Sequence, residues 1–462
     1  GTLALADGSN GGLAANYTLS GGTHQLTVNK APISLTGSRQ YDGTQDVRNS
    51  DFSLSGLQGG EDLTTSGLGS VVSKNIGNGK TVDTSGLTLE NGQTGTAGLA
   101  SNYTFSGGTQ TFNITERVLN MSASRDYNTL KTVSSGIITL SNLVGSETLA
   151  LSGDGSVSDE NVGTNKTIGV DTLSLTDGAN GGIASNYTLA GGTHLLTVNK
   201  AVISITGTRQ YDGSTNALPA DLSLNNLQGG ENLTLTGNGT ISDKNVANGK
   251  ALDVSGLTLG NGSGGTPGLS SNYKLDGGTH TFNVTKKDIT FSGSRVYDGT
   301  TTVSSSDLVT NDTTSGETLA FSGSGTVSSA NVQNNQSITL GSIAIADGSG
   351  GGLASNYNLT SAALTINQKV LNSNSSRIYN ATTTAAASDI TLTNQVSGEA
   401  LQLSNSAATS SKNVGSYSIS NLSGVTISDQ AGANASSGAL AANYTLTGGT
   451  HSFAINPKAV NI

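Results

Sequence analysis

The chain has 462 residues, of which 33% are hydrophobic, 4% aromatic and 11% charged, so any folded unit in it must have a small core. Its formal net charge of −10 argues against a nucleic-acid partner, because binding to phosphates needs clustered Lys and Arg. The chain contains no cysteine, which excludes disulfides, thiol catalysis and thiolate metal sites.

An Asn-Tyr pair recurs along the whole chain and sets its period. The six tyrosines of these pairs are Tyr17, Tyr103, Tyr187, Tyr273, Tyr357 and Tyr444. Consecutive pairs are separated by 86, 84, 86, 84 and 87 residues, a regularity that indicates a tandem array. The stretch resembles a tyrosine corner, in which the hydroxyl of a tyrosine at a strand start bonds back to the backbone. We therefore expect a structural role for these tyrosines and treat stacking on sugars as the alternative.

This period divides the chain in order. We expect the C-terminal part of a truncated repeat over residues 1–30, five repeats over 31–117, 118–200, 201–287, 288–369 and 370–458, and the start of a further repeat over 459–462. We interpret the chain as a segment of a longer array. Corresponding tyrosines in alternate repeats are 170 residues apart over most of the chain, which indicates that a pair of repeats is the duplicated unit.

Within each repeat, short apolar alternations predict strands. In the third repeat they cover residues 203–205, 222–224, 233–235, 257–259, 273–275 and 282–284, with period two and no sustained helical period. Dipeptides such as Asp212-Gly213 and Asn248-Gly249 mark the turns between them. The pattern predicts an all-β chain of small immunoglobulin-like β-sandwiches. Repeats of this size are roughly 35 to 40 Å across, and five joined without flexible linkers would form a rod of roughly 170 to 200 Å. A β-solenoid is the alternative fold.

An Arg-x-Tyr motif follows the first apolar segment of each repeat. Its members are Arg39/Tyr41, Arg125/Tyr127, Arg209/Tyr211, Arg295/Tyr297 and Arg377/Tyr379. Three of them continue as Tyr-Asp-Gly, whereas Tyr127 and Tyr379 are followed by Asn without Gly. Since Asn and Asp make the same turn, the motif indicates turn chemistry and no required carboxylate.

With this motif the chain resembles the YDG and MBG-type bacterial immunoglobulin-like repeats of large surface adhesins, many exported by two-partner secretion like filamentous haemagglutinin. The resemblance covers essentially the whole chain. It implies an extracellular, cell-surface or secreted protein that takes part in cell adhesion and biofilm formation.

Two features invite a metal or ligand interpretation. The four histidines, His24, His194, His280 and His451, occupy one Gly-Gly-Thr-His position. Repeats are too far apart to share metal ligands, so we expect an exposed strand position and no metal. Loops that begin at Asp7, Asp177 and Asp347 offer one carboxylate each, where a calcium loop offers several. We therefore expect no cofactor and keep calcium as the alternative.

No nucleophile-base pair or phosphate-binding loop stands out, so we expect no enzyme activity. We expect a structural stalk or spacer that holds a binding domain away from the cell. Its partners would be a host-cell or matrix component, such as a polysaccharide, bound through regions outside this chain, and an outer-membrane export protein. The alternative is an array of weak carbohydrate- or matrix-binding modules that act through avidity.

Overall fold

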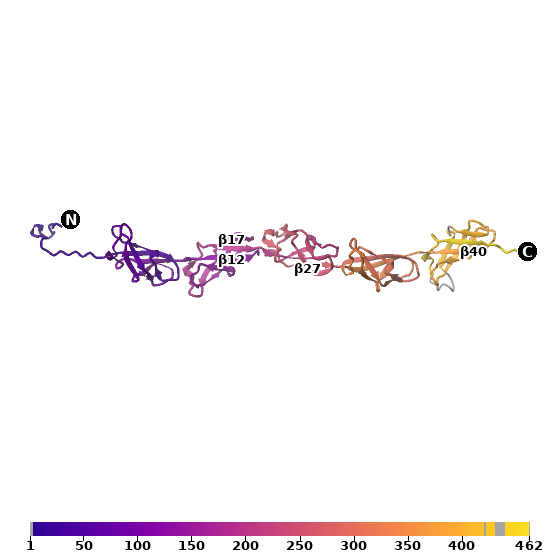
Figure 1. Cartoon of the computed structure of the whole chain (residues 1–462), viewed down its shortest axis with the longest axis horizontal. Helices are drawn as coiled ribbons and strands as arrows, with labels where there is room; N and C mark the ends of the chain where they lie inside the picture. Colours follow the sequence, from indigo (N-terminus) through magenta and orange to yellow (C-terminus); the bar gives the residue numbers. More distant parts are fainter. Residues whose placement is uncertain (1–2, 420–421, 430–438, 462) are drawn as a thin grey trace. The chain divides into compact units, whose positions relative to one another are not determined.

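The computed structural model of the chain describes residues 3–419, 422–429 and 439–461. Residues 1–2 of the expected truncated repeat, residues 420–421 and 430–438 of the fifth repeat, and Ile462 of the expected further strand lie outside the described residues. The chain divides into two compact units, Gly1–Ala201 with Ser271–Tyr273, and Val202–Ser270 with Lys274–Ile462. Figure 1 draws the repeats in sequence order as successive groups of strands.

The described chain is all-β, with strands and short 3-10 helices. The first repeat contains ten strands: β1 (Ala31–Pro32), β2 (Ser34–Gln40), β3 (Asp46–Val47), β4 (Phe52–Ser55), β5 (Leu63–Gly67), β6 (Gly69–Val71), β7 (Gly77–Asp83), β8 (Leu87–Asn91), β9 (Tyr103–Thr104) and β10 (Gln110–Thr115). This is more than the six or seven predicted, because backbone irregularities divide longer strands. In the fourth repeat the equivalents of β1 and β2 form one strand, and so do those of β9 and β10.

The other repeats follow the same order. The second contains β11 (Arg117–Val118), β12 (Asn120–Asp126), β13 (Thr132–Ser134), β14 (Ile138–Ser141), β15 (Leu149–Ser152), β16 (Asp154–Ser156), β17 (Gly163–Thr167), β18 (Ser174–Asp177), β19 (Tyr187–Thr188) and β20 (His194–Asn199). The third contains β21 (Ala201–Val202), β22 (Ser204–Gln210), β23 (Asn216–Ala217), β24 (Leu222–Asn225), β25 (Leu233–Gly237), β26 (Gly239–Ile241), β27 (Ala247–Asp253), β28 (Leu257–Asn261), β29 (Tyr273–Lys274) and β30 (His280–Thr285).

The fourth repeat contains β31 (Lys287–Val296), β32 (Thr302–Ser304), β33 (Leu308–Asn311), β34 (Leu319–Ser322), β35 (Ser324–Val327), β36 (Gln333–Thr339), β37 (Ala344–Asp347) and β38 (Tyr357–Asn367). The described part of the fifth contains β39 (Lys369–Val370), β40 (Asn372–Ile378), β41 (Thr384–Ala386), β42 (Leu392–Thr393), β43 (Leu401–Ala408), β44 (Gly415–Ser418), β45 (Val425–Asp429), β46 (Tyr444–Thr445) and β47 (His451–Asn456).

Short 3-10 helices occupy two recurring places. Those before the Asn-Tyr tyrosines are η1 (Ala14–Asn16), η3 (Ala100–Asn102), η5 (Ala184–Asn186), η8 (Ser270–Asn272), η10 (Ala354–Asn356) and η13 (Ala441–Asn443). Those before β4 and its equivalents β14, β24, β33 and β42 are η2 (Asn49–Asp51), η4 (Ser135–Ile137), η6 (Pro219–Asp221), η9 (Ser305–Asp307) and η11 (Ala387–Asp389), and η7 (Gln228–Gly230) follows β24. Among the described residues, no helix has the length and apolar character needed to cross a membrane.

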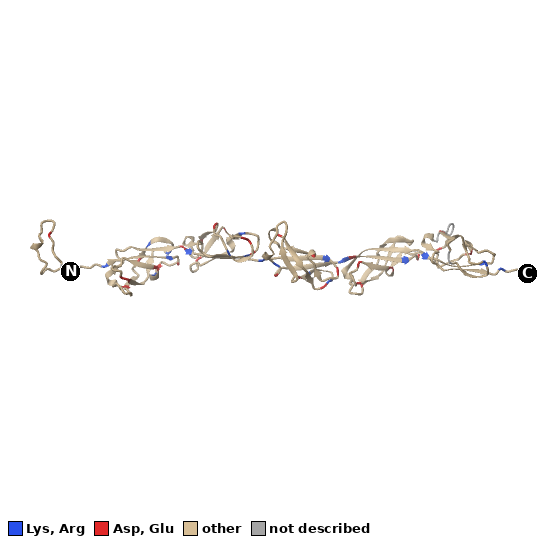
Figure 2. Ribbon diagram, turned by 90° about the horizontal axis from the view of Figure 1, so that it is seen from above, with Lys and Arg blue, Asp and Glu red and all other residues tan. Residues whose placement is uncertain are grey.

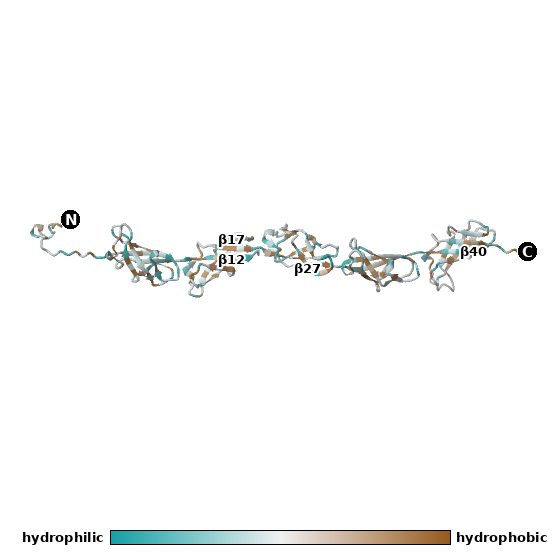
Figure 3. Cartoon of the chain, viewed as in Figure 1, coloured by the Kyte–Doolittle hydropathy of each residue, from teal (hydrophilic) through white to brown (hydrophobic). Residues whose placement is uncertain are grey.

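The sheets of each repeat are formed by strands of that same repeat. In the first repeat the larger sheet has the order β3-β6-β7-β10-β2-β4, and the pairs β5-β8 and β1-β9 complete the fold. The last long strand, β10, pairs in parallel with β2, near the start of the repeat. Alternation along the strands sends one set of side chains inward, so Leu35, Phe112 and Ile114 are buried. Figure 3 shows brown apolar residues interspersed with polar ones in every repeat.

Candidate functional site at the junctions between repeats

The tyrosine of each Asn-Tyr pair directly follows a 3-10 turn, and in every pair except that of Tyr17 it begins a strand. In five of the six pairs it is buried, with an exposure of 3% or less, whereas Tyr17 is 70% exposed. The hydroxyl of Tyr187 accepts the backbone N–H of Val144 at 3.1 Å, and the hydroxyl of Tyr357 accepts that of Thr314 at the same distance. The backbone partner lies 43 residues before the tyrosine in both cases, whereas a tyrosine corner bonds to backbone only a few residues upstream.

The same hydroxyl also donates to a glutamate of its own repeat. Tyr187 donates to Glu147 Oε2 at 2.6 Å, and Tyr357 donates to Glu317 Oε2 at 2.6 Å. The glutamate follows three residues after the backbone N–H that the hydroxyl accepts. Tyr103 with Glu61 and Tyr444 with Glu399 repeat this arrangement, each at 2.5 Å.

A second tyrosine, from the Arg-x-Tyr motif of the preceding repeat, donates to the other oxygen of the same carboxylate. In the first unit, Tyr41 donates to Glu147 Oε1 at 2.7 Å. In the second unit, Tyr211 donates to Glu317 at 2.6 Å and Tyr297 donates to Glu399 at 2.5 Å. One glutamate therefore joins the two tyrosine motifs of successive repeats. We call this glutamate with its two tyrosines the junction cluster.

The two tyrosine rings of a junction also touch. The rings of Tyr41 and Tyr187 meet edge to face with centroids 5.4 Å apart, and the same distance separates Tyr211 from Tyr357 and Tyr297 from Tyr444. Within the first unit, Tyr127 and Tyr273 make this contact as well. Such pairs contribute about 0.5–1.5 kcal/mol beyond the apolar area that they bury.

A lysine completes two of the clusters. Lys74 Nζ lies 3.3 Å from Glu147 Oε1, and Lys244 Nζ lies 2.5 Å from Glu317 Oε1. Burial acts to raise the pKa of Glu147, but hydrogen bonds from Tyr187, Tyr41 and Lys74 outweigh it, so the pKa is lowered. The same balance lowers the pKa of Glu317. The carboxylates are therefore charged when they receive the hydroxyls, and the bonds are charge-assisted.

Burial and the bond to the carboxylate raise the pKa of the cluster tyrosines. For Tyr297, burial and the hydrogen bond to Glu399 raise the pKa to about 12. For Tyr187, burial and the hydrogen bond to Glu147 also raise the pKa. These tyrosines are therefore protonated donors at neutral pH, and neither acts as a base.

A pair of asparagines adds a second contact at each junction. Asn186 donates through Nδ2 to Asn75 Oδ1 of the preceding repeat at 3.0 Å, and its Oδ1 accepts the N–H of Ile76 at 3.0 Å. The same pair of bonds joins Asn272 to Asn161 and Val162 within the first unit. Asn356 and Asn443 repeat it in the second unit. All four of these Asn side chains are buried, so a glycan at Asn186 or Asn443, which begin Asn-Tyr-Thr, would require the junction to open.

The turn of the Tyr-Asp-Gly motif brings the repeat against its neighbour. Asp42 Oδ1 accepts the N–H of Thr44 at 3.0 Å, and Asn128 makes the same bond to Leu130 at 3.1 Å. This agrees with the prediction of turn chemistry. Gly43 has a φ of 79°, and a Cβ on it would lie 2.7 Å from Cγ1 of Val144 in the next repeat. Glycine is therefore favoured at this position both by its backbone conformation and by the neighbouring repeat.

The arginine of the Arg-x-Tyr motif stabilises this turn from inside its own repeat. Arg39 donates to the carbonyls of Asp46 and Thr44, and its guanidinium stacks on Phe112 with 5.6 Å to the ring centroid. The remaining motif arginines, Arg125, Arg209, Arg295 and Arg377, donate to the equivalent carbonyls. They position the motif tyrosine and lie outside the junction cluster.

Two of the junction positions are less buried in the first and fifth repeats, where no described repeat packs against them. Asn102, of the first repeat, is exposed, whereas its equivalent Asn186 is fully buried. Tyr379, the Arg-x-Tyr tyrosine of the fifth repeat, is half-buried, whereas Tyr41 is fully buried. The burial of these residues therefore depends on the adjoining repeat.

The expectation that the histidines are exposed is wrong for most of them. His194 and His451 are buried, at 8% and 4% exposure, and His280 is half-buried, while His24 is exposed. The Nε2 atom of His194 hydrogen-bonds to the carbonyl of Leu189 at 2.7 Å. The preceding glycine provides the space, because a Cβ on Gly192 would lie 2.7 Å from the His194 ring. The imidazole thus holds its own turn closed.

The acidic-glycine loops use their carboxylates within the chain. Asp177 Oδ1 accepts the N–H of Ala184 at 2.7 Å, and Asp347 Oδ1 accepts the N–H of Ala354 at 2.8 Å. Asn261 makes the same bond to Ser270. Over the residues that the structure describes, no group of three or more His, Asp or Glu is placed to hold a metal ion.

Sequence reasoning identified the tyrosines but missed that they meet across junctions. A glutamate also recurs in each repeat, at Glu61, Glu147, Glu231, Glu317 and Glu399. The available signal was its spacing, because this glutamate recurs with the same period as the two tyrosine motifs.

A comparison with protein-family models matches the YDG domain five times along the chain. The matched segments are residues 23–111, 115–194, 196–282, 281–366 and 362–451. No curated protein matches the chain.

Proposed function

Because the chain belongs to the YDG domain family, we propose that it is the structural stalk of a large bacterial cell-surface or secreted adhesin. In this proposal the repeats hold a binding domain, located outside this chain, away from the cell. The partners are a host-cell or matrix component at that domain and an outer-membrane protein that exports the chain. The chain has no catalytic role in this proposal, because the tyrosines and glutamates of the junction clusters bond to each other.

The observation that carries the proposal is the shared glutamate. Glu147 accepts one hydroxyl from each of two successive repeats and is only 7% exposed. Hydrogen bonds to a charged group contribute about 1.5–3 kcal/mol each, so the junction favours one arrangement of the two repeats. The same cluster recurs at Glu317 and Glu399. A set of fixed junctions supports a stalk whose length is set by the number of repeats.

The connections between repeats support the same conclusion. A single residue, Glu116, separates β10 from β11 in the first unit, and Lys286 alone separates β30 from β31 in the second. Connections this short cannot behave as flexible linkers. In a repeat array each unit contacts its neighbours, and stability is a sum of repeat and interface contributions. The junction clusters supply that interface contribution.

Small-angle scattering on the whole chain and on a variant that lacks residues 118–287 tests the proposal. The deletion removes one 170-residue pair and joins the first repeat to the fourth, so Tyr41 and Lys74 meet Glu317 in place of Tyr211 and Lys244. We expect the maximum dimension to fall by about two fifths while the remaining repeats stay folded. An unchanged or compact dimension would contradict the proposal.

The avidity alternative is tested with the same proteins. Binding of this chain alone to polysaccharide or to host cells, with an affinity that falls as repeats are deleted, would favour repeated binding modules. A stalk has no such activity. Full-length adhesin with and without residues 118–287 then separates the two functions, because shortening a stalk changes the reach of adhesion and leaves the affinity at its tip unchanged.

A further inference from the structure

Each repeat leaves two strand edges open next to each other. In the first repeat β4 is the last strand of the larger sheet, and the next strand, β5, pairs only with β8. The equivalent pairs are β14 with β15, β24 with β25, and β33 with β34. In the fifth repeat β42 is the edge, and the first half of β43 pairs with β45 on one side. We call these two strands the edge pair of a repeat.

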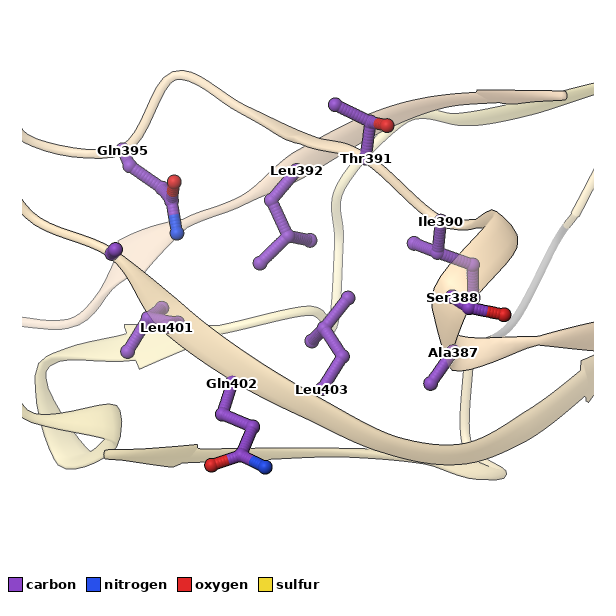
Figure 4. Close-up of a pocket in the computed structure, with 10 residues that line it drawn as sticks. Ala387, Ser388, Ile390, Thr391, Leu392, Gln395, Leu401, Gln402 and Leu403 are labelled. Carbon is purple, nitrogen blue, oxygen red and sulfur yellow. The ribbon is translucent and has the colours of Figure 1, made fainter. Parts of the chain in front are cut away.

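A groove runs between the two strands of the edge pair. In the fifth repeat it has a volume of about 680 Å³, and in the first repeat a groove of about 380 Å³ lies in the same place. Figure 4 shows Leu392 and Leu403 pointing toward each other across the groove, while Gln402 points away from it. The apolar side chains Leu392, Leu401 and Leu403 are only half-buried. The groove is therefore an incompletely closed side of the sandwich.

The edge pairs lack two of the features that protect a sheet edge, charged residues and prolines, although their strands are short. Proteins prevent edge-to-edge pairing with charged residues, prolines or bulges on edge strands. None of the ten edge-pair strands contains a charged residue or a proline. The opposite strands of the small sheets differ, since β8 carries Glu90 and β18 carries Asp177. Figure 2 shows how sparsely charge is placed along the chain.

We propose that the edge pairs are lateral docking surfaces for a second copy of this chain, joined by antiparallel pairing of edge strands. The strands alternate apolar residues with Ser, Thr and Asn, as in Leu222-Ser223-Leu224-Asn225. A strand of this pattern places its apolar residues in the groove and its polar residues in water. The edge strand of a second copy has the same pattern, so the surface is self-complementary, as a two-fold interface requires.

Because the edge pairs recur along the chain, a second copy of this chain is a better partner for them than a single unrelated strand. One edge strand of four or five residues forms only a few backbone hydrogen bonds, and each contributes little net stability in water. A second copy carries the same edges in the same order along its sequence. Several weak contacts then act together, and the apparent affinity rises by avidity. The inference goes beyond the proposed stalk function, because a stalk can be monomeric.

Charge predicts the response to salt. The chain has a net charge of −10, so two copies repel each other, whereas the edge strands that would meet are uncharged. Salt screens the repulsion between the chains and leaves apolar and backbone contacts intact. Association through the edge pairs therefore increases with ionic strength. Association through ion pairs would instead decrease as the ionic strength rises.

Sedimentation equilibrium of the whole chain tests the proposal. We expect the average mass to rise from 46.1 kDa toward twice that value with increasing protein concentration, and at lower concentration when salt is added. Hydrogen exchange on the associated sample should slow at β4 and β5 and stay unchanged at β8. A chain that remains monomeric at all concentrations and salt levels would overturn the proposal, as would exchange protection confined to other strands.

Matched lysine variants locate the contact. The first variant places Lys on the exposed face of each edge strand, at Ser53, Thr139, Ser223, Val309 and Thr391. The control places Lys on the neighbouring strand, directly opposite these positions, at Thr36, Ser122, Thr206, Ser292 and Asn374. Both variants gain the same charge at exposed positions. We expect the edge variant to be monomeric and the control to associate. Equal association of two folded variants, judged by matching thermal unfolding, would overturn the proposal.

Discussion

Glu147→Gln removes one charge from the junction of the first and second repeats and keeps the shape of the side chain. The carboxylate accepts Tyr41, Tyr187 and Lys74. Glutamine has one acceptor oxygen, so one tyrosine keeps a hydrogen bond to a neutral group. The other tyrosine hydroxyl lies opposite the NH2 group of the amide, which cannot accept its proton. Lys74 also loses its partner. A charge-assisted bond contributes about 1.5–3 kcal/mol and a neutral one about 0.5–1.5, while the half-exposed lysine adds less than about 1 kcal/mol. We expect a loss of about 3 kcal/mol of junction stability.

The first repeat offers a matched control. Glu61 accepts Tyr103 at 2.5 Å, and no Arg-x-Tyr motif precedes it in the chain. In Glu61→Gln the amide oxygen can still accept this hydroxyl, so only the charge assistance is lost. We expect a cost of about 1 kcal/mol. The difference between the two variants measures what the preceding repeat contributes through Tyr41.

Hydrogen exchange of individual amides measures both effects. The N–H of Ile76 bonds to Asn186 across the junction, and the N–H of Val144 bonds to Tyr187 beside it. A loss of about 3 kcal/mol corresponds to a roughly hundredfold faster exchange. We expect this acceleration at both amides in Glu147→Gln and a far smaller one in Glu61→Gln. Equal acceleration in the two variants would refute the reasoning, because it would mean that the shared carboxylate contributes nothing between repeats.

Three further results follow from the same contacts. Asn186→Ala should lower the free energy of unfolding by about 2 kcal/mol, because it leaves buried partners unsatisfied, whereas Asn102→Ala should change it by less than about 0.5 kcal/mol; urea unfolding compares them. His280→Gln should be nearly neutral, since the first repeat has glutamine there. His280→Leu should lower the melting temperature, because it removes the acceptor of the Ile205 N–H and one of two bonds to the carbonyl of Leu275. Stability should also depend on pH: the pKa of Glu317 is lowered from its ordinary 4.5, so its contribution is present above that value and is lost as the pH falls through the lower folded pKa. The pKa of Tyr297 is raised from its ordinary 10.0 to about 12. Its contribution to the free energy of unfolding is therefore fully present below pH 10.0 and is lost as the pH rises through about 12. The melting temperature plotted against pH should show a plateau between the acid and alkaline limits.

The all-β fold and the length of the repeat were predictable because both follow from patterns within short stretches of sequence. Alternation at period two predicted the strands, and Asp-Gly or Asn at the turns predicted the residues with positive φ. Thr129 and Ala381 adopt φ values of 65° and 60° where three other repeats have glycine. The Asn or Asp before these residues makes the turn in every repeat, which is why the motif tolerates the loss of its glycine.

The junction clusters were not predictable from the same patterns. Tyr41 bonds to a glutamate 106 residues away, in a different repeat, so no local pattern links the two. The histidines were predicted to occupy exposed strand positions because histidines in different repeats lie too far apart to share a metal ion. In the structure the absence of a Cβ on the second glycine lets the imidazole lie over the backbone, and this depends on tertiary packing.

The junction lysines give a physical meaning to the 170-residue period. Lys74 and Lys244, 170 residues apart, contact the shared glutamates of the first and third junctions. The equivalent residue of the fourth repeat is Ala330, and that of the second is Glu160, which lies 3.9 Å from Lys131 of its own repeat. Alternate junctions therefore differ in charge. Joining the second repeat directly to the fourth would place Glu160 where Lys244 meets Glu317, and like charges would oppose each other there. Removing a pair of repeats preserves the matching lysine, and this is why deletion of residues 118–287 should leave a complete junction while deletion of residues 201–287 should leave a weakened one.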